Sequence, residues 1–448
     1  MNPCDEFYRQ LFRRTSEYVG TGALDPAPVH VSVGEDATKS RAGQTAAVAL
    51  LNLLARSHRV LSLDLPDAEV PLLIDVPFGR ASTLSECLFE QVRAIDPCGE
   101  FHASSVRPDG FLSVGIGRQA ASNCEWFVGA QNSIAFLNRS PQEFGASDGT
   151  LRGAGLAAIL GAAAMFRAQL RMDSAPRVLS CWNYEEANRA EEGPASLEAL
   201  DVGRMLVIGA GAVGSSLGYW IRLFGWGGAC VIVDKDPIEI HNLNRSLLFT
   251  AVDAGWPAGP ARYKCDVLAD ALPNTVPVRR WYDEYAADNS SEFDLVLCLA
   301  NERGVRHELA CRNFSVLLHA TTGTNWTSQL HRHVPGIDDC VFCRAGEIKP
   351  VQFGCSTGEV ITPEGERSDA ALPFLSAASG LMLATLLQRL QYGCLTDLDC
   401  NDWRWDFNSL YRMASKGKRC CSDTCTRVSS KSIRDQLHMK GRWKHLEQ

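Results

Sequence analysis

The chain has 448 residues, of which 46% are hydrophobic and 21% charged, and its formal net charge is −8. This length predicts two or three domains, and the negative charge disfavours a surface built to bind nucleic acid. No apolar run reaches the roughly 18 residues that a membrane span requires. We therefore expect no membrane partner and interpret the apolar runs at 46–55 and 154–166 as buried helices.

The N-terminal segment is charged and lacks the apolar stretch of a signal peptide, which favours a cytoplasmic protein. In a reducing compartment, the 17 cysteines indicate metal ligation or thiol chemistry rather than disulfides. Many of them are expected to be small buried hydrophobic side chains.

The first half of the chain predicts a helix at 6–18 and then a strand, helix and strand unit. Its first strand ends at Gly34, its helix covers 43–57, and its second strand ends before Asp64. The remaining elements expected in this half are three strand-like runs and a small-residue helix, at 70–76, 110–116, 124–129 and 154–170.

The loop after Gly34 carries Glu35 and Asp36. Carboxylates at this position would repel a phosphate group, so we expect that the first unit does not bind nucleotide. The acidic, turn-rich stretch at 185–203 is predicted to be a linker.

A second strand, helix and strand unit follows, and it carries a glycine-rich turn. The segment RMLVIGAGAVGSSL places Gly209, Gly211 and Gly214 in the spacing GxGxxG, and the next strand ends at Asp234, twenty residues after Gly214. Glycines allow a tight turn and close approach to a phosphate, while the helix N-terminus presents free N–H groups. Some glycine turns that open helices bind nothing, but the strand, helix and acid together predict nucleotide binding, with Asp234 on a ribose.

The rest of the second half repeats the pattern of the first. A loop opens a helix within 255–273, strands are expected at 276–281 and 293–299, and a helix at 379–390 is similar to the one at 154–170. The predicted fold class is α/β, with two Rossmann-like domains in tandem, the first degenerate and the second active, each a mostly parallel sheet with helices on both faces. The expected boundaries are 1–195 and 196–448.

Two cations follow the glycine turn in sequence. Arg245 lies in the segment NLNRS, and Lys264 opens the next helix. Two fixed cations would suit a reaction in which an anion attacks a phosphate. Taken singly, each could equally be a solvated loop charge.

Cysteine spacing predicts a structural zinc site. Cys340 and Cys343 form a CxxC pair, and a second group near the C-terminus contains Cys420, Cys421 and Cys425. Two such pairs complete a tetrahedral zinc site, although the spacing does not decide between Cys420 and Cys421. A redox pair is the alternative interpretation of the CxxC.

The segments GAGAVGSSL, VDKDPIEIHNLNR, FDLVLCLANERGVR and CVFC together resemble the adenylating domain of ubiquitin-activating enzymes and their ThiF, MoeB and HesA relatives. The resemblance implies that the nucleotide is ATP and that a C-terminal glycine carboxylate of a ubiquitin-like protein is adenylated. The residues it assigns to the phosphates, ribose and magnesium are Gly209, Gly211, Gly214, Asp234, Asp236, Asn242, Arg245, Lys264 and Asn301. Arg262 is an alternative to Lys264. Asn301 stands where the family has the magnesium aspartate, so that Asp236 or Glu302 would have to assist.

The same resemblance implies roles for residues outside the glycine turn. Arg9, in YRQLF, resembles the arginine that reaches into a partner's ATP site. Cys355 occupies a position similar to that of the thioester cysteine in a segment at about 344–372, from which the modifier would pass to a conjugating enzyme. The CxxxxC spacing of the family's second zinc pair favours Cys420 with Cys425. The chain also resembles activating enzymes encoded in bacterial antiviral conjugation operons.

Three alternatives stay open at this point. A sulfur-carrier adenylyltransferase would have no thioester step, and a scaffold would bind its partner without catalysis. An oxidoreductase using NAD would leave the zinc pairs and the NLNR segment without a role.

Overall fold

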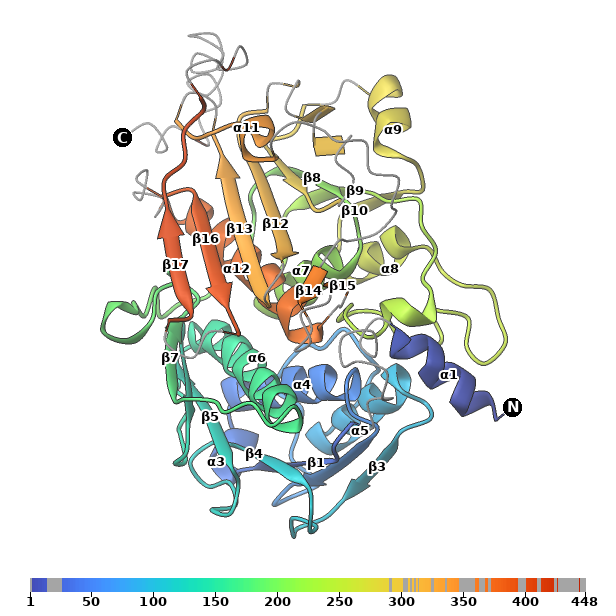
Figure 1. Cartoon of the computed structure of the whole chain (residues 1–448), viewed down its shortest axis with the longest axis vertical. Coiled ribbons are helices and arrows are strands. Elements are labelled where there is room, and N and C mark those ends of the chain that lie inside the picture. Colours follow the sequence, from blue (N-terminus) through green and yellow to red (C-terminus); the bar gives the residue numbers. More distant parts are fainter. Residues whose placement is uncertain are drawn as a thin grey trace.

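The computed structural model describes two α/β halves stacked on one another (Figure 1). The described residues are 2–13, 26–289, 292–300, 305–306, 308–309, 312, 314–323, 326–334, 337–345, 359–361, 367–369, 372–393, 400–408, 412–422, 425 and 443.

The first half contains a seven-stranded sheet in the order β3-β2-β1-β4-β5-β6-β7. Its strands are β1 (Val29–Val33), β2 (Val60–Asp64), β3 (Glu100–Ala103), β4 (Leu112–Ile116), β5 (Trp126–Gln131), β6 (Ile134–Asn138) and β7 (Arg177–Ser180). The strands from β3 to β5 are parallel, whereas β6 and β7 are antiparallel to their neighbours.

The second half contains an eight-stranded sheet in the order β10-β9-β8-β11-β12-β13-β16-β17. Its strands are β8 (Arg204–Ile208), β9 (Ala229–Val233), β10 (Thr275–Val278), β11 (Leu295–Cys298), β12 (Leu317–Gly323), β13 (Thr327–His333), β16 (Asp402–Asp406) and β17 (Ala414–Gly417). Its first seven strands repeat the order and directions of the first sheet, which agrees with the predicted duplication.

The helices and the remaining elements connect these strands. They are α1 (Pro3–Leu11), α3 (Glu35–Thr38), α4 (Arg41–Ala55), α5 (Leu84–Ile95), α6 (Thr150–Gln169), α7 (Ala212–Phe224), α8 (Lys264–Ala271), α9 (Tyr282–Asp288), α11 (Val341–Ala345), α12 (Pro373–Gln391), the 3₁₀ turns η1 (Ala187–Arg189) and η2 (Ile240–Asn242), and the hairpin β14 (Glu359–Ile361) with β15 (Arg367–Asp369). Caps fix some of their ends: Ser40 accepts the Gly43 N–H at the start of α4, and Thr83 and Glu86 form a capping box at α5.

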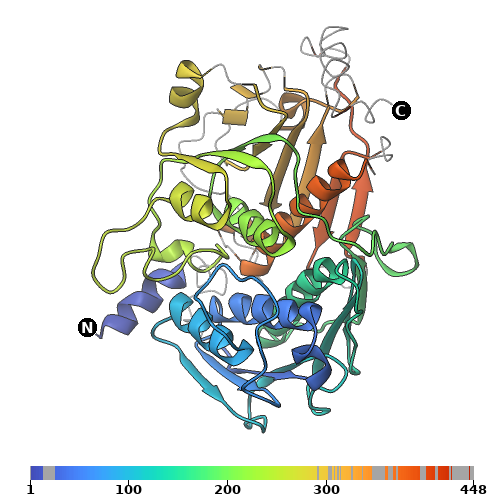
Figure 2. The same cartoon turned by 180° about the vertical axis from the view of Figure 1, so that it is seen from behind.

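The two halves meet through their central helices (Figure 2). Helices α4 and α6 pack together, α7 packs on α12, and α6 contacts α12. Small residues allow the close approach between the halves, since a Cβ at Gly155 of α6 would lie 2.8 Å from the Trp220 ring of α7. Between the halves, the Tyr184 hydroxyl donates to the Met382 carbonyl of α12 at 2.9 Å. Both halves therefore share one continuous core. Helix α6 is long and apolar enough to cross a membrane, but 94% of that stretch is buried in this core.

Helices cover both faces of the second sheet but not of the first. In the second half, α9 lies on the face opposite α7 and α12, above a separate apolar cluster. In the described part of the first half, α4, α5 and α6 all lie on the face toward the second half (Figure 1). In the described residues the opposite face carries the small apolar cluster of Ala120, Cys124 and Phe127 and no long helix, so the prediction of helices on both faces is wrong for the first sheet.

Two further predictions need correction. The strand expected at 70–76 is absent from the described residues, which show only an isolated bridge between Pro71 and Thr83. No disulfide is expected from the sequence, but Cys4 of α1 and Cys98 of the turn after α5 form one. Their Cα atoms are 5.5 Å apart, because α1 packs beside this turn. The sequence does not predict the strands β3 and β12 or the antiparallel strands β6, β7, β13, β16 and β17.

Candidate nucleotide site

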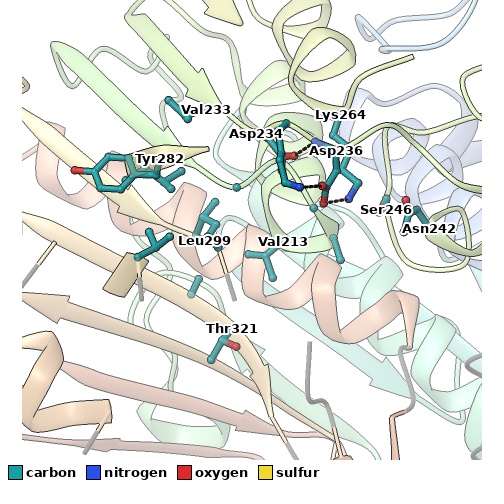
Figure 3. Close-up of a pocket in the computed structure, with 18 of the residues that line it drawn as sticks. Val213, Val233, Asp234, Asp236, Asn242, Ser246, Lys264, Tyr282, Leu299 and Thr321 are labelled. Atoms are coloured by element: carbon teal, nitrogen blue, oxygen red, sulfur yellow. Dashed lines mark hydrogen bonds and ion pairs between the residues drawn. The ribbon is translucent and has the colours of Figure 1, made fainter. Parts of the chain in front are cut away.

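A cavity of about 330 Å³ opens where β8, β9, β11 and β12 end, and we call it the glycine-turn cavity (Figure 3). In doubly wound sheets, ligands bind at this edge, outside the carboxyl ends of the strands. The predicted residues that line it are Gly209, Gly211, Asp234, Asp236, Asn242, Arg245 and Lys264.

The three glycines serve different purposes in the turn. Gly209 has φ +97°, and a Cβ there would lie 2.6 Å from the backbone nitrogen of Ala300. At Gly214, which does not line the cavity, a Cβ would lie 2.5 Å from the Gly209 carbonyl oxygen, so this glycine lets α7 pack on the turn. Gly211 faces open space, since a Cβ there meets nothing within 4 Å. The turn therefore exposes backbone to a ligand at Gly211.

Asp234 holds the turn in place from the end of β9. One carboxylate oxygen accepts the Ala210 N–H at 2.7 Å, and the other accepts the Asp236 N–H at 2.9 Å. Burial raises the pKa of Asp234, while the nearby Lys264 ammonium opposes that shift. Each oxygen retains capacity to accept a further hydrogen bond, as contact with a ribose hydroxyl would require.

Lys264 projects from the first turn of α8 into the same cavity, with only 8% of its side chain exposed. Its Nζ lies 2.9 Å from a carboxylate oxygen of Asp236, and its backbone N–H donates to the Asp236 carbonyl at 3.0 Å. Figure 3 shows Asp234, Asp236 and Lys264 grouped on one side of the cavity. The alternative Arg262 pairs instead with Asp253 at 3.0 Å and with Asp270, and it does not line the cavity.

Arg245 and Asn242 come from the loop that begins with η2. The Asn242 side-chain oxygen accepts the Glu239 N–H at 3.0 Å, which fixes the turn. The Arg245 guanidinium donates to the His241 carbonyl at 2.8 Å and to the Asn244 side-chain oxygen at 2.9 Å. Arg245 is only 7% exposed and lines the cavity, so its charge is held in position.

Arg56, the C-cap residue of α4 in the first half, donates hydrogen bonds to the backbone of this loop. Its guanidinium donates to the carbonyls of Leu243, Leu247 and Phe249, at 2.5, 2.7 and 3.2 Å. Arg56 is 1% exposed, and burial lowers its pKa to about 9. Sequence reasoning missed this contact because it joins residues nearly two hundred positions apart.

Sequence reasoning also missed several residues of the cavity wall. They are Lys235, Arg280, Trp281, Tyr282, Arg306, Thr321 and Thr322. Those at 280–282 directly follow β10, so the rule that ligands bind at the carboxyl ends of strands could have found them. The Lys235 ammonium lies 3.5 Å from the centroid of the Trp281 ring, which is cation–π geometry.

Arg9 does not reach the cavity. It forms two hydrogen bonds with Glu6, at 2.8 and 2.6 Å, and 71% of its side chain is exposed. Helix α1 does pack against η2, and Phe7 contacts Trp256 with ring centroids 5.1 Å apart. Arg9 is not among the described residues that line the cavity, and the catalytic role expected of it stays a prediction.

In the first half, the Asp36 side chain fills the turn that corresponds to the glycine turn. The Asp36 carboxylate accepts the N–H groups of Arg118 and Gln119, at 2.8 and 3.0 Å, and lies against Gly117. The carboxylate thus occupies the place where backbone N–H groups would otherwise meet a phosphate. This geometry agrees with the expectation that the first unit does not bind nucleotide.

Four thiols meet beside α11. The Sγ atoms of Cys340, Cys343, Cys421 and Cys425 all lie within 4.8 Å of one another. This donor set suits a tetrahedral zinc ion. Cys421 takes the place predicted for Cys420 in the cluster. The exposed Cys420 side chain lies outside it. The predicted pairing with Cys425 is otherwise retained.

Two predicted residues, Cys355 and Asn301, lie outside the described residues, as does Glu302. Their expected roles therefore stay predictions.

A family model described as the ThiF family matches residues 185–411. The chain belongs to the ThiF family. The matched stretch covers the glycine-turn cavity and the second sheet except its edge strand β17, but not the first sheet.

Three relatives are similar to parts of this chain. It is 27% identical over 347 residues to the uncharacterized protein y4jF of Sinorhizobium fredii, covering 73% of this chain and 62% of that protein. It is 31% identical over 137 residues to the Nedd8-activating enzyme E1 catalytic subunit of Drosophila melanogaster, covering 30% of this chain and 29% of that subunit. It is 24% identical over 164 residues to the sulfur carrier protein ThiS adenylyltransferase of Escherichia coli, covering 36% of this chain and 65% of that enzyme. The chain thus spans less than two thirds of each relative's length.

Proposed function

We propose that this ThiF-family chain binds ATP in the glycine-turn cavity and adenylates the C-terminal glycine carboxylate of a ubiquitin-like protein. The observation that carries the proposal is the placement of Lys264 and Arg245 on the wall of a cavity that Gly211 opens to solvent. Relatives named for Nedd8 activation and for ThiS adenylylation support the same reaction class.

In the proposed reaction, a carboxylate oxygen attacks the α-phosphorus of ATP. A bond from oxygen to phosphorus forms as the bond to the departing pyrophosphate breaks, leaving an acyl-adenylate. Lys264 and Arg245 stabilise the negative charge on the phosphates, and the turn at Gly211 allows the backbone to approach them. Asp234 orients the ribose. Asp236 could ligate magnesium through a carboxylate oxygen, the type of ligand that this ion prefers, and the ion would neutralise phosphate charge.

The test of this step is exchange of pyrophosphate into ATP in the presence of a glycine-ending ubiquitin-like protein. We expect Lys264→Met to lower the exchange rate by about 100-fold, the scale typical of losing one preorganised charge at a phosphate. Arg262→Met and the exposed Arg118→Met provide comparisons outside the cavity. Exchange that is insensitive to Lys264→Met but lost in Arg262→Met would reassign the phosphate contact.

The second proposed step transfers the acyl group to Cys355. Its thiolate attacks the acyl carbon, AMP departs, and a thioester is formed for delivery to a conjugating enzyme. An adduct that requires ATP and is cleaved by a reducing agent should form with the native chain and be lost in Cys355→Ala. An adduct that survives Cys355→Ala would reject this cysteine as the acceptor.

The second candidate function is adenylation without a thioester step. The similarity to the ThiS adenylyltransferase of Escherichia coli favours this alternative. Adenylate formation that persists unchanged in Cys355→Ala, with no thioester on any cysteine, would select it. Membership of an antiviral conjugation operon stays a prediction from the sequence.

A further inference from the structure

A second cavity of about 500 Å³ lies beside the first, over β12, β13, β16 and β17, and we call it the basic cavity. Among the described residues that line it, one is a carboxylate, Asp402, and six are cations: Arg306, Arg344, Arg404, Lys416, Lys418 and Arg419. The role proposed above does not use this charge.

Two of these cations, Lys416 and Lys418, pair with carboxylates that are buried behind the wall. Lys416 pairs with Glu185 at 3.6 Å, and Lys418 pairs with Asp338 at 2.9 Å, yet Glu185 and Asp338 are only 4% and 0% exposed. Arg344 and Arg419 pair with Asp402 on the wall itself, at 2.7 and 2.9 Å, and 59% of the Arg419 side chain is exposed. The face presented to a ligand is therefore cationic.

A buried histidine on β12 adds a polar contact inside the cavity. His319 is 4% exposed, lines the cavity, and has no hydrogen-bond partner on either ring nitrogen within the described part of the chain. Burial lowers its pKa well below the usual value, so the ring is neutral and offers one donor and one acceptor. A peptide backbone carries both complementary groups, whereas leaving a buried ring unpartnered is unfavourable.

The basic cavity borders the glycine-turn cavity. Arg306 and Thr321 line both of them. A polypeptide lying in the basic cavity could therefore place its C-terminal end in the glycine-turn cavity, where the phosphates are proposed to bind.

We propose that the basic cavity binds the segment that precedes the C-terminal glycine of the adenylated protein, and that it selects a segment rich in Asp or Glu. This inference rests on the proposed function and adds the chemistry of the substrate. The opposite charge of the exposed cations favours carboxylate side chains, and His319 hydrogen-bonds the backbone of the bound segment.

The test uses fluorescein-labelled eight-residue peptides ending in Gly-Gly, with either Asp and Glu or Lys at the preceding positions. Anisotropy titrations of the full chain, without ATP, should show at least about tenfold tighter binding of the acidic peptide, with a difference that shrinks as salt rises. The double variant Arg404→Glu/Lys416→Glu should lose about tenfold in affinity for the acidic peptide.

Two controls separate charge recognition from damage to the fold. The exposed Arg118→Glu, in the first half, should leave peptide binding unchanged. The double variant should bind the Lys peptide more tightly than the native chain does, a gain that misfolding cannot produce. Equal binding of the two peptides, no effect of the double variant, or equally tight binding of a single-stranded oligonucleotide would overturn the inference.

The outcome also separates this inference from the proposed function. Pyrophosphate exchange with a glycine-ending protein, combined with equal binding of both peptides, would reject the inference alone. Selective binding of the acidic peptide with no exchange for any glycine-ending protein would reject adenylation but retain the docking surface.

Discussion

At the scale of single residues, the glycines of the turn differ in how much folding stability an added side chain would cost. In Gly209→Ala the new Cβ would meet backbone at 2.6 Å, and φ +97° disfavours any L side chain. We expect a loss of stability of roughly 1–3 kcal/mol. Gly211→Ala meets no atom within 4 Å and should fold normally, but its methyl group enters the cavity.

Thermal unfolding and ATP titration distinguish these effects. Gly211→Ala should keep the native melting temperature and bind ATP about tenfold more weakly, a difference of about 1.4 kcal/mol. Native ATP affinity in Gly211→Ala would show that the phosphates do not approach this turn.

A buried carboxyl group makes the docking of α1 sensitive to pH. Asp96 accepts a hydrogen bond from Tyr8 at 3.1 Å, and burial raises its pKa to about 7 from 3.8. A raised carboxyl pKa means that the folded state favours the protonated form. The protonated Asp96 carboxyl therefore contributes its full share of the folding stability below about pH 4. This contribution is lost as the pH rises through 7, and the total loss is at most about 4 kcal/mol.

Asp96→Asn is uncharged at every pH and should remove this slope. Chemical denaturation measures the free energy of unfolding of both chains. The value for the variant minus the value for the native chain should be larger at pH 8 than at pH 5. A difference in stability that does not change with pH would contradict the raised pKa.

At the scale of elements, the cysteine cluster joins α11 to the segment after β17. The native chain should hold one zinc ion per molecule, and Cys421→Ser should reduce that content by weakening the four-thiolate site. Cys420→Ser, one residue away, is the matched control and should retain zinc. Elemental analysis of the purified variants measures both, and the reverse pattern would restore Cys420 as the ligand.

Arg56 is expected to position the Arg245 loop. Arg56→Met leaves the carbonyls of Leu243, Leu247 and Phe249 without this buried donor, which should cost roughly 2–5 kcal/mol of local stability. Hydrogen exchange at 243–249 should accelerate, and the KM for ATP should rise more than kcat falls. In Arg56→Lys, hydrogen exchange at 243–249 and the KM for ATP should both return part of the way to their native values. Unchanged exchange at 243–249 would contradict a positioning role.

The sequence predicted the elements whose signals are local. Periodicity and glycine spacing predict the strands at 204–208 and 229–233 and the helix between them, whereas the preference for Lys264 over Arg262 rests on the family resemblance. Contacts between distant segments left no such signal. Arg56 reaches a loop in the other half, and the choice of Cys421 over Cys420 depends on how the chain after β17 approaches α11.

At the scale of the whole molecule, two halves with the same strand order have diverged at the turn where a phosphate would bind. In the first half Asp36 fills the turn, whereas in the second half Gly211 leaves it open. From the charge of the loop after Gly34, the sequence predicts that the first half binds no nucleotide, and this stays a prediction. The first half instead contributes packing through α4 and α6 and the support that Arg56 gives to the Arg245 loop.

The most direct test of this asymmetry is a crystal structure with a non-hydrolysable ATP analogue. We predict one nucleotide per chain, with its phosphates over the turn at Gly211 and within reach of Lys264 and Arg245. A nucleotide at the turn of Gly34, or phosphates bound away from Lys264 and Arg245, would contradict the proposal that the second half alone forms the active site.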